Sequence, residues 1–316
     1  MINKIREQLS LINNIQANIR EYICTYRYQI MLMEDREKWN QICSSLDILG
    51  DTLLSISDYI ETKYPKEIGL RYIYTYGILQ VLYVQQDTVK HLLEAFSIKY
   101  KNNDKLQKIR TLRNNTVGHP SKRDIKENSK KFVRCDVIVR MTLSKRSFSY
   151  NQFFPEGKVQ GQDVDFFDTL HVQLNEILNY YQSIMIKLKD TEKDHKDKYK
   201  DILLNNIFSR TEYLLEKVYT GIISSQGNDR KRGLLMLNDI QNQYKKFENS
   251  LQERNELDEA LKHDLGIYNY ALSRIKSFLA NSMDDLNDAV ICFYYIKNNH
   301  DEYKNIALKI DKEYNE

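Results

Sequence analysis

Apolar residues recur at helical spacing along most of the chain. The first stripe predicts one long helix and is formed by Ile5, Leu9, Ile12, Ile19, Ile23 and Ile30. A second runs from Ile42 to Ile60 and ends before Pro65. A third, over about 66–100, is apolar around much of its circumference, which predicts the central helix of a bundle. A shorter helix follows and should stop at Gly118-His119-Pro120, where glycine supplies a left-handed cap and proline prevents continuation.

The hydrophobic period changes from about 3.6 to about 2 between Phe132 and Phe154. Apolar and polar residues alternate over 133–142, and the alternation resumes at Ser147 after a turn signal. We predict one antiparallel hairpin within 132–153, closed by Pro155-Glu-Gly157, as the only substantial β-structure. Helices should cover most of 1–125 and 163–314. The expected fold class is therefore all-α, a mainly helical bundle with one inserted β-hairpin near 132–153.

The run Lys187 to Lys200 is almost wholly charged, so it is either a solvated helical surface or the connection to a second domain. We place the boundary here, with a bundle over 1–190 and a C-terminal helical domain or helical extension over 191–316. Its helices are predicted near 201–223, 229–263, 267–281 and 284–297, with a last one to about Tyr314. A short coiled-coil-like seam is formed by Leu237, Ile240, Tyr244, Phe247 and Leu251.

Composition narrows the class of protein. The 316 residues include only 10 Gly and 3 Pro, which favours long helices. No signal-peptide-like or membrane-spanning apolar run is present, so we expect a cytoplasmic protein that does not enter a membrane. The four cysteines form no CxxC pair and are interpreted as reduced core thiols. The six histidines are scattered, so no metal site and no cofactor are predicted, and the histidines other than His119 are expected at surface or packing positions.

Positive charge is concentrated in one part of the chain. Between Ser97 and Ser147 there are 15 Lys/Arg and 4 Asp/Glu, an excess of +11, although the net charge of the whole chain is only +3. Such an excess indicates either a polyanionic partner or a solvated lysine-rich loop region. Charge alone leaves both open.

The most informative segment is Arg113-Asn-Asn-Thr-Val-Gly-His119-Pro120, at the end of a predicted helix inside the basic stretch. An arginine, a polar residue and a histidine after five intervening positions, preceded by a long helix with an embedded Asp87, resembles the motif of the HEPN ribonuclease family. The resemblance is clearest over 66–125, extends weakly over 1–190 and says nothing about 200–316. It implies a helical bundle that forms a homodimer with two motifs facing each other. It also implies a metal-independent endoribonuclease of the kind found in toxin–antitoxin and phage-defence systems, with RNA and a possible antitoxin or defence partner protein as partners.

The residue types suit cleavage of RNA. His119 can exchange a proton near neutral pH, and Arg113 presents a fork of donors that matches a phosphate. Asn114 would orient these two groups. We expect Asp87 to be a buried carboxylate that holds Arg110 or Arg113 in place. The phosphate backbone of RNA is expected to meet the basic residues Lys122, Arg123, Lys130 and Lys131.

Two less specific interpretations remain open. Arg110, Arg113 and His119 could serve only to meet the negative end of a helix dipole, followed by a glycine cap and a proline stop. The protein would then be a non-catalytic helical RNA-binding or protein-interaction module. Burial of Arg113 and His119 behind the hairpin would favour that alternative, whereas an open position would favour catalysis.

Overall fold

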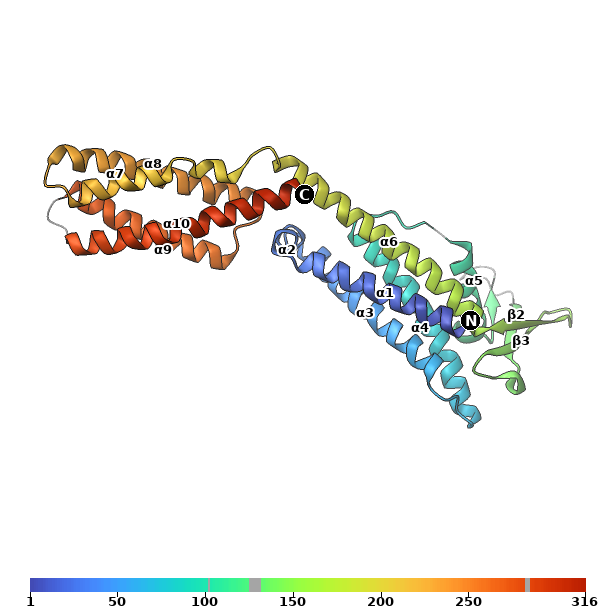
Figure 1. Ribbon diagram of the computed structural model, residues 1–316. Helices are drawn as coiled ribbons and strands as arrows, with labels where there is room; N and C mark the ends of the chain where they lie inside the picture. The colour runs from blue at the N-terminus through green and yellow to red at the C-terminus, as the bar shows by residue number, and fades with distance from the viewer. Residues whose placement is uncertain (102, 125–131, 282–284) are drawn as a thin grey trace. The chain divides into compact units, whose positions relative to one another are not determined.

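The computed structural model describes residues 1–101, 103–124, 132–281 and 285–316. The chain divides into two compact units, shown in Figure 1. Unit 1 contains 1–24 and 32–189, and unit 2 contains 25–31 and 190–316. The division falls inside helix α6 (Phe166–Tyr199), within the charged run at which the sequence suggested a boundary. The difference is the short segment 25–31, which belongs to unit 2.

The helices of unit 1 enclose an aliphatic core. They are α1 (Ile2–Cys24), α3 (Arg36–Glu61), α4 (Ile68–Ala95), α5 (Asp104–Arg113) and the first part of α6. The single first helix predicted through Ile30 was wrong. The chain breaks at Thr25 and continues as α2 (Tyr26–Met33), because Arg27 is buried in unit 2, where it pairs with Glu256 and Glu313.

A polar network crosses the core of unit 1. Gln85 on α4 donates to the Thr52 hydroxyl at 3.1 Å, and Gln86 donates to the Gln173 side chain at 2.7 Å. Gln173 in turn donates to the Gln85 oxygen at 2.9 Å. The polar residues Gln85, Gln86 and Asp87 interrupt the apolar run of α4 and face two different sides. Gln85 and Gln86 face an internal network, whereas the neighbouring Asp87 faces α5.

The predicted hairpin is confirmed, and the fold is mainly α. Strands β2 (Phe132–Ile138) and β3 (Ser147–Phe153) pair antiparallel. The sheet is larger than predicted, since β4 (Val159–Asp165) pairs with β3 along its whole length and the two residues of β1 (Arg123–Asp124) pair with β2. Pro155-Glu-Gly157 is the turn into β4 rather than the end of the sheet, with Gly157 at a φ of 76°. Strand β4 escaped detection because most of its side chains are exposed and it lacks apolar alternation.

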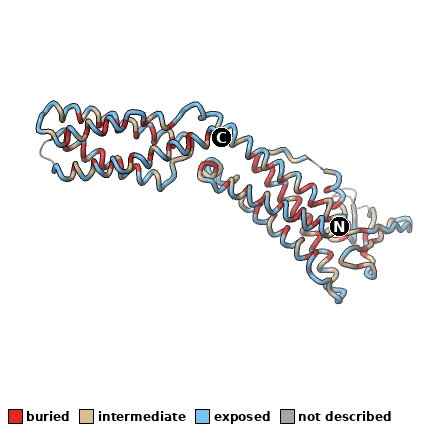
Figure 2. The backbone as a smooth tube through the Cα atoms, in the orientation of Figure 1, coloured by how far each residue is buried: buried red, intermediate tan, exposed pale blue. Residues whose placement is uncertain are grey.

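Unit 2 is a second helical bundle with its own core. After a 3₁₀ turn at Leu204–Phe208 come α7 (Thr211–Ile223), α8 (Gly227–Glu253), α9 (Glu259–Ala280) and α10 (Leu286–Asn315). The five seam residues on α8 are fully buried. Figure 2 shows buried positions recurring along the helices of this unit. Two predicted boundaries were wrong. The helix predicted over 229–263 ends at Glu253, because Asp258 caps a new helix by accepting from the Leu261 backbone, and α10 is continuous where two helices were predicted.

Two further expectations concern the cysteines and the possibility of a membrane-spanning helix. All four cysteines are free thiols, as predicted, but none is in the core: Cys24 is exposed and the others are half-buried. Among the residues that the structure describes, no helix is long and apolar enough to cross a membrane.

Helices α7 and α8 meet at a pair of glycines, which gives a prediction for stability. A Cβ added at Gly221 would lie 2.9 Å from the Asp229 carbonyl oxygen and 3.0 Å from the Gly233 Cα. We expect Gly221→Val to lower the free energy of unfolding of unit 2 by about 1–3 kcal/mol, since backbone atoms cannot yield as a side chain would. Urea unfolding followed by circular dichroism measures this. The control is Gly266→Val, because a Cβ there meets nothing within 4 Å. Fluorescence of the single tryptophan, Trp39 in unit 1, should stay unchanged.

Candidate active site

A π-helical turn places the histidine of the motif. Helix α5 starts at the cap residue Asn103, whose side chain accepts from the Lys105 and Leu106 backbones, and the helix ends at Arg113. Residues Asn114–Gly118 then form one wide turn, closed by the His119 N–H that donates to the Asn114 carbonyl at 2.9 Å. Such turns are rare and are frequent at functional sites. The turn ends with the His119 side chain exposed.

Gly118 has a different task from the one predicted. It is not a left-handed cap, since Gly157 has the only positive φ among the described glycines. A Cβ on Gly118 would instead lie 2.7 Å from the Arg113 Nη1 atom. A Cβ at this position would therefore displace the guanidinium, which packs against the backbone of the π-helical turn.

Arg113 is fixed by neutral groups. Its Nε and Nη2 atoms donate to Gln80 Oε1 at 3.0 and 2.7 Å, and Nη1 donates to Asn114 Oδ1 at 3.1 Å. The guanidinium carbon lies 4.5 Å from the centroid of the Tyr83 ring. These bonds use three of the five N–H donors of an arginine and leave one on each terminal nitrogen. Within the described parts of the chain, no carboxylate pairs with Arg113, so its charge is not neutralised.

Asp87 holds the other arginine. Arg110 donates to Asp87 Oδ1 at 2.5 Å, and its guanidinium carbon lies 4.2 Å from the centroid of the same Tyr83 ring. The pairing of Asp87 with an arginine was predicted, but the predicted burial was wrong, because the Asp87 side chain is 39% exposed. Burial acts to lower the pKa of Arg110, and hydrogen bonds to Asp87 and Tyr83 outweigh it, so that pKa is raised. Tyr83 therefore lies against both guanidinium groups.

The sequence reasoning missed Gln80 and Tyr83. Together with Asp87 they lie at spacings of three and four residues on one face of α4, which is the face turned to α5. That spacing was the available signal. The charged Asp87 is the more conspicuous residue of the stripe, because a carboxylate is rarer than a glutamine or a tyrosine in an apolar helix.

The predicted RNA-binding residues are only partly described. Lys122 is exposed, and Arg123 lies in β1. Lys130 and Lys131 lie outside the described residues. The loop that follows the motif is tied to the sheet, since the Asp136 N–H of β2 donates to the Pro120 carbonyl at 2.8 Å.

Taken together, the arrangement offers an accessible imidazole and an uncompensated cation on one helix end. The exposure of His119 is the open position that a catalytic role requires, and the hydrogen bonds of Arg113 described above go to side-chain oxygens instead of helix carbonyls. Within the described ranges, no three His, Cys, Asp or Glu residues cluster in a way that could hold a metal ion. No family model, curated protein or solved structure matches this chain. The geometry of the site is therefore the basis for any functional proposal.

Proposed function

We propose that this protein is a metal-independent endoribonuclease that resembles the HEPN family. The observation that carries the proposal is the guanidinium of Arg113, fixed by the neutral Gln80 and Asn114 and left with its full charge against Gly118, the residue before the exposed His119. A fixed and uncompensated cation is most useful where a phosphate gains negative charge during reaction. The exposed imidazole can exchange protons with a bound substrate.

The reaction would be an internal transfer at phosphorus. The ribose 2′-oxygen loses its proton to an imidazole and forms a bond to the phosphorus atom. The bond from phosphorus to the 5′-oxygen breaks, and an imidazolium gives that oxygen a proton. The products are a 2′,3′-cyclic phosphate and a 5′-hydroxyl. Arg113 would stabilise the phosphorane with its two remaining N–H groups, and Asn114 would keep the guanidinium in position.

One histidine cannot readily be base and acid in the same step, so we propose a homodimer in which two His119 side chains share the site. The face of α4 that bears Gln80 and Tyr83 continues toward its N-terminal end with apolar residues. Ile73 is 63% exposed and Tyr76 is 39% exposed, at the same spacing of three and four residues. Burial of this stripe against a second copy would bring the two motifs together.

The dimer gives the next prediction. Ile73→Glu should convert the protein to a monomer and lower cleavage in parallel, because a charge would enter the apolar contact. Light scattering at micromolar concentration measures the mass. Ile186→Glu on α6 is the control, since Ile186 is 61% exposed and lies away from the motif. A wild-type protein that is only monomeric, or a dimer held solely by residues beyond 200, would contradict the arrangement.

A substitution at Gln80 tests whether the uncompensated charge of Arg113 matters. Gln80→Glu keeps the size and the hydrogen bonds but neutralises the guanidinium. We expect the cleavage rate to fall by about 10²-fold, similar to the loss of one stabilising donor. The control is Gln107→Glu, which adds the same charge at an exposed position of α5. Equal rates for the two variants would show that the charge balance at Arg113 has no role.

The most general test is an assay of the purified protein against a mixed RNA pool in the presence of a chelator. We expect cleavage by the wild-type chain and none by a variant that lacks both Arg113 and His119. RNA binding without cleavage would instead support the non-catalytic RNA-binding alternative. A ribonuclease of this kind would act in the cytoplasm, and an antitoxin or defence partner would restrain or trigger it. Co-purification from its native host identifies such a partner.

A further inference from the structure

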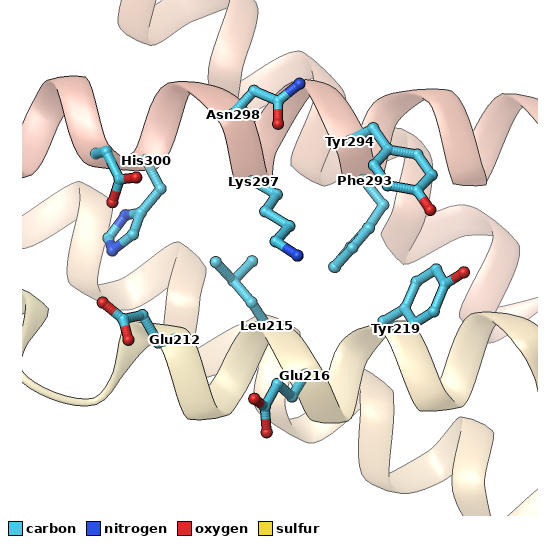
Figure 3. Close-up of a pocket in the computed structure, with 10 residues that line it drawn as sticks. Glu212, Leu215, Glu216, Tyr219, Phe293, Tyr294, Lys297, Asn298 and His300 are labelled. Atoms are coloured by element: carbon cyan, nitrogen blue, oxygen red, sulfur yellow. The ribbon is translucent and has the colours of Figure 1, made fainter.

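Unit 2 contains a pocket that the proposed ribonuclease site does not use. It lies between α7 and α10 and has a volume of about 660 Å³ (Figure 3). Pockets of roughly 300–1,000 Å³ are typical of sites for small molecules. One wall is aromatic and is formed by Tyr219, Phe293 and Tyr294.

A buried histidine with an unsatisfied nitrogen lines the pocket. His300 is only 2% exposed, and its Nδ1 lies 2.8 Å from the Tyr244 hydroxyl. Its Nε2 has no hydrogen-bond partner among the residues that the structure describes. Buried polar groups are nearly always paired, so an unpaired one needs an explanation. Burial lowers the pKa of His300, which keeps the ring neutral near pH 7. With its Nδ1 bonded to the Tyr244 hydroxyl, the neutral ring adds no positive charge to the lining of the pocket.

The charges around the pocket favour a cation. The carboxylates of Glu212, Glu216 and Asp301 line it, and only Glu212 has an ion-pair partner among the described residues, the Lys304 ammonium at 3.3 Å. The aromatic wall also favours a cation, because the faces of aromatic rings attract ammonium groups. An anionic ligand such as a nucleotide would meet these carboxylates and be repelled.

The protein itself places an ammonium group in this pocket. Figure 3 shows the Lys297 side chain directed between Leu215 and Phe293. Lys297 forms no ion pair within the part of the chain that the structure describes. It is exposed, so its side chain can also turn outward. An ammonium group is therefore accommodated here, and Lys297 acts as a tethered competitor for the same place.

We propose that the pocket between α7 and α10 binds a small organic cation with an aromatic body, an arylalkyl ammonium compound. Its ring packs on Tyr219 and Phe293, and its ammonium group takes the place of the Lys297 ammonium among the carboxylates that line the pocket. This inference uses none of the residues proposed for RNA cleavage.

Three probes of similar shape and different charge test the proposal on the full chain. They are 2-phenylethylammonium, 2-phenylethanol and 3-phenylpropanoate, each titrated by calorimetry. We expect a Kd on the order of 1 mM for the ammonium compound, as suits a ligand of this size, and binding at least about tenfold weaker for the other two. Equal or tighter binding of the alcohol or the carboxylate would overturn the proposal. So would the absence of binding when the ammonium compound is present at roughly ten times the expected Kd.

Three variants test the charges around the pocket one at a time. The substituted positions are exposed, so that folding is preserved. Glu216→Gln should weaken binding of 2-phenylethylammonium by about three- to fivefold, the scale of a partly exposed ion pair. Lys297→Met should tighten it by about threefold, because the competing ammonium is gone. Glu302→Gln, on α10 but outside the pocket, should have no effect. Weakened binding in Lys297→Met, or an unchanged Kd in Glu216→Gln, would contradict a cation site. Equal melting temperatures by circular dichroism show that all three variants are folded.

Discussion

Replacing His119 by alanine is expected to lower the rate of RNA cleavage by about 10²–10⁴-fold, the usual range for a positioned acid–base group. RNA affinity should stay nearly unchanged, because the basic residues around the motif provide the binding. The imidazole is exposed and makes no hydrogen bond to the residues that the structure describes, so the variant should be as stable as the wild type. Single-turnover kinetics and fluorescence anisotropy on the same RNA measure rate and affinity.

His91→Ala is the matched control for this substitution. His91 is also an exposed histidine of unit 1, located on α4, and we expect its removal to leave the rate unchanged. A rate that falls equally in both variants would point to a general loss of charge or folding. A His119→Ala protein that cleaves as fast as the wild type would leave the motif with a purely structural role at the helix end.

Removal of a single 2′-hydroxyl from the substrate should have an effect of similar size. An RNA with one 2′-deoxynucleotide at the cleaved position should remain intact there, because the attacking oxygen is missing. It should bind as tightly as the parent RNA, and DNA of the same sequence should bind but stay uncut. Cleavage at the deoxynucleotide would show that water attacks instead.

Reversal of Lys122, Arg123, Lys130 and Lys131 to glutamate should weaken binding and flatten its dependence on salt.

The sequence predicted the features that depend on local pattern. Helical spacing identified α3 and the buried seam of α8, because each of these helices buries an apolar stripe. It also identified α4, whose apolar positions continue on both sides of Gln85 and Gln86. The switch to a period of two identified β2 and β3, and in β3 alternate residues face the core. In β2 the inward face is the opposite of the one that the alternation indicated, because Asp136 is buried and Val137 is 51% exposed. The pairing of Asp87 with a nearby arginine was also predictable, because a carboxylate inside an apolar helix needs a partner.

The features that depend on contacts between distant segments could not be predicted. The break at Thr25 follows from the burial of Arg27 against Glu256, more than two hundred residues later. The support of Arg113 by Gln80 depends on how α4 and α5 cross. The role of Gly118 appears only when the guanidinium position is known, because the sequence alone favoured a helix cap. His300 was expected at an exposed or packing position, and only the fold reveals that it is buried beside a pocket, with an Nε2 that has no partner among the described residues.

The chemistry of the cleaved ends tests the central claim most directly. The purified wild-type chain is incubated with one defined RNA in the presence of a chelator, and the product ends are identified by mass spectrometry. Attack by the 2′-oxygen under the control of Arg113 and His119 predicts a 2′,3′-cyclic phosphate and a 5′-hydroxyl, formed at the same rate with and without chelator and absent for the Arg113→Ala/His119→Ala variant. A 3′-hydroxyl with a 5′-phosphate, cleavage that chelation abolishes, or cyclic-phosphate products from the double variant would contradict it.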